Sequence, residues 1–136
     1  VYAVTLNVTG LIPNQLGFEA EEVTVAQTAS SVNLVIRRKA ATRGETVRVT
    51  TTDGPGAANP FHAPAIGGVD YLPFNQVVTF SAGQSMRTVN ISLMPMTGSV
   101  DNRQFTVSLS EPIGGASITR ATTLVRIRAT DTTAPV

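Results

Sequence analysis

The sequence contains no cysteine, so disulfide bonds, thiolate metal ligands and cysteine nucleophiles are all excluded. It also lacks tryptophan, and aromatic residues make up only 5% of its 136 residues. Nucleic-acid binding needs clustered basic residues or stacking aromatics, and the net charge is only +1, so we expect no nucleic-acid partner. No apolar run reaches the ~18 residues of a membrane-spanning helix, so we also expect no membrane span.

Catalytic patterns are missing as well. His62 is the only histidine, and no nucleophile-elbow pattern accompanies it. A phosphate-binding glycine loop would need a following helix, and no stretch of the sequence shows a helical hydrophobic period. We therefore predict that the chain is not an enzyme.

Hydrophobic residues instead recur at every second position. The alternating segments are 2–8, 32–36, 47–49, 89–93, 105–109 and 125–127. Strict alternation indicates strands with one buried side and one solvent-facing side, as in antiparallel sheets packed face to face. Charged residues are only 14% of the chain, a balance that suits an exposed β surface rich in threonine and valine. The sequence predicts an all-β fold, an antiparallel two-sheet immunoglobulin-like β-sandwich, in one domain.

Turn-forming residues separate these segments. Ser81-Ala82-Gly83-Gln84 is predicted to be a short turn, and the segment Glu111-Pro112-Ile113-Gly114-Gly115 is expected to stop a strand because proline cannot donate to a ladder. Residues 53–76 are rich in glycine and proline and predict a long surface loop. Residues 132–136 predict a linker or tail. No leader peptide is visible at Val1, so we expect a mature protein or a fragment of a longer one.

The first residues are an alternating strand. Residues 1–17 form a lead-in in which Tyr2, Val4, Leu6 and Val8 share one face. Such a strand must pair with something, and these four residues are therefore candidate interaction residues. Three partners are open: the chain's own sandwich, a preceding domain, or the sheet of a neighbouring subunit by strand addition.

Two asparagines lie in N-x-S/T sequons and are candidate glycosylation sites. They are Asn7, followed by Val8 and Thr9, and Asn90, followed by Ile91 and Ser92.

The order of several segments resembles one family, the Calx-beta domain. Gly68-Val69-Asp70-Tyr71-Leu72-Pro73 matches its G-x-D-Y-x-P signature. Residues 78–84 resemble its T-F-x-x-G-E segment, residues 105–109 are similar to its F-x-V-x-L strand, and residues 32–37 resemble a strand that ends in a characteristic arginine, here Arg37. The resemblance covers residues 18–131 and implies an immunoglobulin-like sandwich with calcium sites at one end.

The resemblance also implies calcium ligands at positions that this chain fills mostly with other residues. Asp70 and Asp131 keep an acidic residue, and Asp101 lies between two loop positions. The remaining positions carry Gln27, Pro95, Met96, Thr97, Val100, Arg103, Ala129 and Thr130. Ca²⁺ takes ~6–8 oxygen ligands, several of them carboxylates, and proline, methionine and arginine side chains are poor substitutes. We therefore expect no cofactor, with Asp70, Asp101 and Asp131 as the residues of a weak calcium site in the alternative case.

Two residues of the signature then need structural roles. Asp70 is expected to accept backbone N–H bonds in a turn. Tyr71 is expected to pack its ring against the edge of the sandwich and to keep its hydroxyl in water.

The leading hypothesis is a non-catalytic structural or adhesive module of an extracellular, cell-surface or filament-forming protein. It rests on the resemblance, the low-charge surface and the missing catalytic groups. The expected partners are proteins, including copies of the chain or neighbouring domains in a tandem array, met by edge or end-to-end contacts. The alternative is a calcium-binding Calx-beta module with a weak or reduced metal site.

Overall fold

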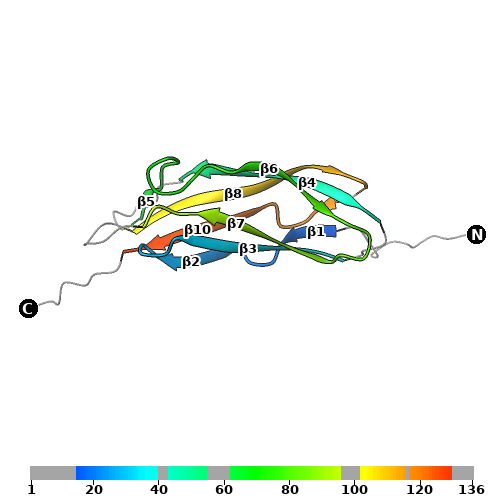
Figure 1. Cartoon of the computed structure of the whole chain (residues 1–136), viewed down its shortest axis with the longest axis horizontal. Helices are drawn as coiled ribbons and strands as arrows, with labels where there is room; N and C mark the ends of the chain where they lie inside the picture. Colours follow the sequence, from blue (N-terminus) through cyan, green and yellow to red (C-terminus); the bar gives the residue numbers. More distant parts are fainter. Residues whose placement is uncertain (1–14, 40–42, 55–61, 96–101, 116, 130–136) are drawn as a thin grey trace, which may run out of the picture.

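The computed structural model describes residues 15–39, 43–54, 62–95, 102–115 and 117–129. These residues form two packed layers of strands (Figure 1). The strands are β1 (Gln15–Phe18), β2 (Glu22–Ala26), β3 (Ser31–Arg38), β4 (Glu45–Asp53), β5 (His62–Pro64), β6 (Asn75–Phe80), β7 (Met86–Ser92), β8 (Asn102–Ile113), β9 (Ser117–Ile118) and β10 (Thr122–Arg128). The predicted all-β sandwich is confirmed, and the described residues include no helix able to span a membrane.

The smaller sheet has the order β7-β3-β1-β9, and the larger sheet has the order β2-β10-β8-β4-β6 with β5 added beside β8. Most neighbours are antiparallel, but β1 with β9, β2 with β10 and β5 with β8 are parallel. The sheets are therefore mixed, whereas the alternation predicted antiparallel sheets. Two of the parallel pairs belong to two similar connections. β1 to β2 and β9 to β10 both pass from the smaller sheet to the larger one, and they run side by side in the same direction.

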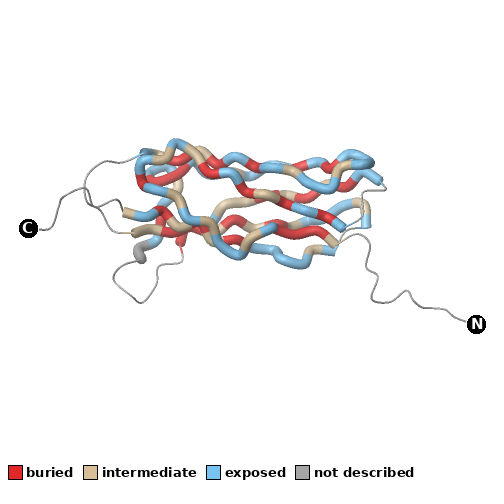
Figure 2. The backbone as a smooth tube through the Cα atoms, turned by 90° about the horizontal axis from the view of Figure 1, so that it is seen from below, coloured by how far each residue is buried: buried red, intermediate tan, exposed pale blue. Residues whose placement is uncertain are grey.

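The core lies between the sheets and follows the predicted alternation (Figure 2). Val32, Leu34 and Ile36 of β3 are buried, as are Val47 and Val49 of β4. Burying an aliphatic side chain of this size contributes roughly 1.5–3 kcal/mol, so the alternating positions account for much of the driving force for folding.

The described sandwich begins at Gln15, within the segment that the sequence assigned to the lead-in. β1 pairs with β3 and β9, and its Leu16 and Phe18 are buried in the core. Gly17 lies so close to the next segment that a Cβ there would approach the backbone N of Arg120 to 2.6 Å, which explains a glycine inside this strand. The predicted strand over residues 2–8, and with it Asn7, lies outside the described residues.

The strand stop predicted for residues 111–115 is confirmed, because β8 ends at Ile113, although Pro112 itself lies inside the strand. β8 continues to Ile113, which is opposite Thr46, while Ser110 is opposite Arg48. Two residues of β8 therefore lie opposite the single residue between Thr46 and Arg48, which is a β-bulge. Glu111 in this bulge has a left-handed φ of 51°. A bulge tolerates proline because the extra residue need not donate to the ladder.

Residues 53–76 are not one unbroken loop, so the prediction of a long surface loop over these residues is wrong. They contain β5, which pairs with β8, and a compact turn at 66–72 that we call the Asp70 turn. The short turn at 81–84 is confirmed, with the Gln84 N–H donating to the Ser81 carbonyl at 2.9 Å and Gly83 at a φ of 93°.

Candidate functional site

The Asp70 turn lies at one end of the sandwich and is closed by hydrogen bonds. The Asp70 side chain is only 4% exposed, and its Oδ2 accepts the Ile66 N–H at 2.8 Å. The Asp70 N–H donates to the Ile66 carbonyl at 2.8 Å, and the Gly68 N–H donates to the Tyr71 carbonyl at 2.7 Å. The Asp70 carbonyl accepts the Met94 N–H at 3.0 Å, which ties the turn to the segment after β7. The turn-holding bond predicted for Asp70 is therefore present.

The second carboxylate oxygen of Asp70 pairs with an arginine. Oδ1 forms an ion pair with Nη1 of Arg103 on β8, and the two side chains are 4% and 12% exposed, respectively. Burial lowers the pKa of the Arg103 guanidinium from its ordinary value. Arginine nevertheless keeps its charge in proteins, so the buried carboxylate has a permanent cation beside it.

A hydrogen-bonded carboxylate supports the other side of the turn. Oδ1 of Asp53, at the end of β4, accepts the Tyr71 hydroxyl at 2.5 Å and the Gly67 N–H at 2.7 Å. The Tyr71 bond first, and then the Gly67 bond, hold the pKa of Asp53 below its usual value. Burial, followed by the bond to Asp53, raises the pKa of Tyr71. The prediction of a solvated Tyr71 hydroxyl is wrong, because Asp53 binds it and the residue is 1% exposed.

The Tyr71 ring is anchored in the core by a second aromatic ring. Tyr71 and Phe105 stack with their ring centroids 4.0 Å apart and their planes inclined by 13°. Such aromatic pairs add about 0.5–1.5 kcal/mol beyond the area that they bury. The stack joins the Asp70 turn to the first part of β8.

Comparison with known proteins agrees with this arrangement. The family model of the Calx-beta domain matches residues 12–134. The chain belongs to the Calx-beta domain family. It is 33% identical over 95 residues to the adhesion G-protein coupled receptor V1 of Danio rerio, a match that covers 68% of this chain and 1% of that much longer protein.

Solved Calx domains share the fold of this Calx-beta domain. The apo form of the Calx CBD1 domain superposes with a TM-score of 0.75 and 18% identity, covering 86% of this chain and 97% of that chain. A structure described as the calcium binding domain CBD12 of CALX1.1 superposes with a TM-score of 0.70 and 18% identity, and the match covers 83% of this chain and 43% of that chain. At these identities the likeness establishes the fold alone.

The residues described at the calcium positions of the family do not fit a calcium cluster. Gln27 is buried and its backbone N–H donates to the Arg128 carbonyl, and the Ala129 N–H donates to Asn102 Oδ1. Asp70 has its oxygens engaged by Arg103 and Ile66. Within the described ranges, no group of three or more histidine, cysteine or acidic residues could hold a metal ion. Met96, Asp101 and Asp131 lie outside those ranges.

Two of the other candidate residues of this Calx-beta domain lie in described strands. Asn90 is exposed on β7, where its Nδ2 donates to Asn33 Oδ1 at 2.8 Å. The backbone of His62 lies in β5. The interaction candidates Tyr2, Val4, Leu6 and Val8 lie outside the described residues.

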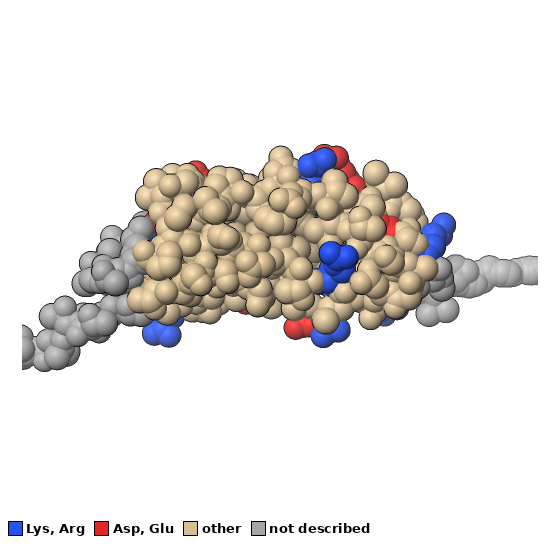
Figure 3. All heavy atoms as spheres, viewed as in Figure 1, with Lys and Arg blue, Asp and Glu red and all other residues tan. Residues whose placement is uncertain are grey.

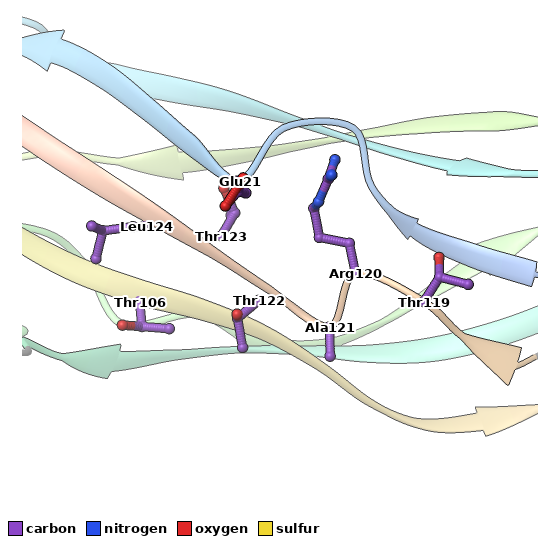
Figure 4. A pocket seen from close by; sticks show the side chains of 8 residues that line it. All are labelled: Glu21, Thr106, Thr119, Arg120, Ala121, Thr122, Thr123 and Leu124. Atoms are coloured by element: carbon purple, nitrogen blue, oxygen red, sulfur yellow. The ribbon is translucent and has the colours of Figure 1, made fainter.

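A shallow hollow lies beside β10 (Figure 4). Its described lining includes four threonines, and Glu21 and Arg120 are its only charged members. The Arg120 guanidinium donates to the Glu19 carbonyl at 2.8 Å, so this cation already supports the β1–β2 connection. The described lining offers no histidine, no carboxylate pair and no aromatic ring, and this arrangement supports neither acid–base catalysis nor stacking of a ligand.

The bonds to Asp53 are expected to make stability depend on acid pH. Because the folded state lowers the pKa of Asp53 below 3.8, the unfolded chain binds a proton more readily. The contribution of Asp53 to the free energy of unfolding is therefore complete above the pKa of the unfolded chain. It is lost as the pH falls through the lower pKa of the folded state. Urea unfolding from neutral to strongly acidic pH should show the wild-type advantage over Asp53→Asn shrinking as the pH falls. An advantage that stays constant would contradict a role for the Asp53 charge.

Proposed function

We propose that this Calx-beta domain is a non-catalytic structural module that joins to a second copy or a neighbouring domain end to end, in an extracellular or cell-surface protein. The observation that carries the proposal is the placement of exposed apolar side chains at the two ends of the sandwich. The module would act by spacing and by contact, as expected when sandwich domains are arranged in line.

The path of the chain suits an in-line arrangement. β1 begins with Gln15 at one end of the sandwich, and β10 ends with Arg128 at the opposite end (Figure 1). A domain whose chain enters at one end and leaves at the other places its neighbours along its long axis.

Each end exposes large apolar side chains. On the Asp70 turn, Ile66, Val69 and Leu72 are 41%, 57% and 47% exposed. At the opposite end, Met86 begins β7 and is 44% exposed, and Ile113 ends β8 and is 68% exposed. On the face seen in Figure 3, charged side chains are few, and some of the basic ones lie beside an acidic one. Apolar residues gathered at two tips favour contacts between tips.

The curated relative supports the cell-surface setting. It is an adhesion receptor by name, and this chain spans 1% of its length. The part of that receptor that matches this chain therefore has neighbouring segments on its own polypeptide. A filament-forming protein would use the same end-to-end geometry.

Strand addition is a second way of joining copies. Among the described strands, each sheet has two free edges: β7 and β9 in the smaller sheet, and β2 and β6 in the larger one. An added strand could pair with any of these free edges. In this version, residues 2–8 of one copy would complete the sheet of the next copy.

Sedimentation over a range of protein concentrations tests the two versions. We expect Val69→Ser with Leu72→Ser to weaken self-association by about tenfold or more, because two apolar side chains leave the contact. The matched control is Val77→Ser, since Val77 is 51% exposed on the side strand β6. Deletion of residues 1–10 should leave association unchanged if the ends carry it and give a monomer if strand addition carries it. Equal association of the end variant and the Val77 control would contradict the end-to-end contact.

A further inference from the structure

We propose that the Arg103 guanidinium is a built-in cation at this end of the sandwich and that it makes the Asp70 turn independent of calcium. The inference rests on the contacts of Asp70 and Arg103 and does not depend on the proposed function. It concerns how the turn is held, whereas the proposed function concerns what the turn contacts.

The coordination of Asp70 leaves no place for a metal ion. Oδ1 pairs with Arg103 and Oδ2 accepts the Ile66 N–H, so a calcium ion would have to displace one of these groups. A divalent ion beside the guanidinium would also meet a like charge in a poorly solvated place. Displacing the arginine would also cost free energy, because the buried guanidinium would be left without the carboxylate that compensates its charge.

The backbone holds Arg103 in position from both sides. In the larger sheet, Arg103 is opposite Ile127 of β10 on one side and opposite Ala63 of β5 on the other. The strand that carries the cation therefore cannot move away from Asp70 without breaking two ladders. A bound metal ion can dissociate, whereas this cation is a covalent part of a central strand.

The ion pair joins the apolar tip to the core. Asp70 lies within the turn that displays Val69 and Leu72, and the ring of Tyr71 next to it stacks on Phe105, two residues after Arg103. The Arg103–Asp70 pair and the aromatic stack thus reach the turn from the same strand. The shape of the tip is consequently fixed by side chains of the chain itself, at any calcium concentration.

Thermal unfolding of the full chain in millimolar CaCl2 and in EDTA tests calcium independence directly. We expect the two melting temperatures to agree within about 1 °C. In a domain that binds calcium, a calcium concentration of a hundred times the Kd would raise the melting temperature by roughly 10 °C. A rise of that size, or a binding isotherm for CaCl2 in titration calorimetry, would overturn the proposal.

Variants test the role of the guanidinium. Arg103→Gln should lower the melting temperature by roughly 10 °C, because it leaves a buried carboxylate without its cation. Arg103→Lys keeps a positive charge and should lower the melting temperature by less. Asp70→Asn combined with Arg103→Gln should recover part of the lost melting temperature, because no unpaired charge remains.

The matched control is Arg37→Gln. Arg37 also pairs with a carboxylate, that of Glu19, but the two side chains are 57% and 47% exposed. This variant should shift the melting temperature by less than about 3 °C. If Arg103→Gln and Arg37→Gln have equal effects, the built-in cation is not what holds the turn.

Discussion

Arg38→Gln is expected to lower the free energy of unfolding by about 3–5 kcal/mol. Arg38 and Glu45 form an ion pair at 2.9 Å in which both side chains are 0% exposed. Removing the guanidinium leaves the Glu45 carboxylate in the protein interior without its partner. Breaking a buried pair from one side costs far more than losing an exposed pair, because the remaining charge is no longer compensated.

The guanidinium of Arg38 also binds three backbone carbonyls. Nε donates to Gln84 at 2.5 Å, Nη1 to Arg43 at 2.7 Å and Nη2 to Ser81 at 2.8 Å, and the group lies 5.1 Å from the centroid of the Phe80 ring. These carbonyls belong to the loops after β3 and β6. Arg38 therefore joins two loops at the end of the sandwich opposite the Asp70 turn, and glutamine is too short to replace these bonds.

Urea unfolding followed by circular dichroism measures this effect. Arg37→Gln, one residue away on the solvent side of β3, is the matched control and should cost less than about 1 kcal/mol. Arg38→Met combined with Glu45→Leu should be more stable than Arg38→Gln, because it leaves no unpaired charge. Equal losses for Arg38→Gln and Arg37→Gln would show that the buried pair contributes no more than an exposed one.

Phe105→Ala is expected to destabilise the fold by a comparable amount, about 3–5 kcal/mol. Phe105 is 0% exposed in β8, between β10 and β4, and its ring stacks on Tyr71. Alanine would leave a cavity in the centre of the core and would remove the support of the Asp70 turn. This substitution should therefore affect both global stability and the order of the tip.

A double-mutant cycle separates these two effects. Phe105→Leu and Tyr71→Leu, alone and together, keep apolar volume while they remove the stacked rings, and the coupling should be about 0.5–1.5 kcal/mol. Ile36→Val, a smaller deletion in the other sheet toward the opposite end, should show no coupling to Tyr71 and serves as the control. A coupling near zero between residues 71 and 105 would mean that the stack adds nothing beyond burial.

The alternation of hydrophobic residues predicted most of the sandwich, and the same alternation also indicates two buried charges. Val32, Leu34 and Ile36 point inward, so the same period places Arg38 inside and Arg37 outside. Val47 and Val49 likewise place Glu45 inside. The resemblance led us to Arg37 as the characteristic arginine. Two opposite charges at inward positions of strands in facing sheets are the sequence signal of the buried pair.

Other features could not be predicted from local patterns. β5 has only three residues in a proline- and glycine-rich stretch, and it exists because β8 offers it a parallel edge. β1 has only four residues, and its Leu16 and Phe18 are too few alternating positions to identify a strand from the sequence. The Arg103–Asp70 pair depends on the register of β8, so the sequence presented Arg103 only as a poor calcium ligand and not as the partner of Asp70.

The parallel pairing of β2 with β10 has a mechanical consequence. Five residues of β2, from Glu22 to Ala26, are in register with residues 124–128 of β10. A pull on Gln15 and Arg128 would drag these two strands in opposite directions along their shared axis. The hydrogen bonds between them would then be loaded in shear and would have to break together, whereas a hairpin can be unzipped one bond at a time. Resistance to such a pull is set by the height of the unfolding barrier. Tension along the long axis therefore acts on the β2–β10 hydrogen bonds in the direction in which they resist it best.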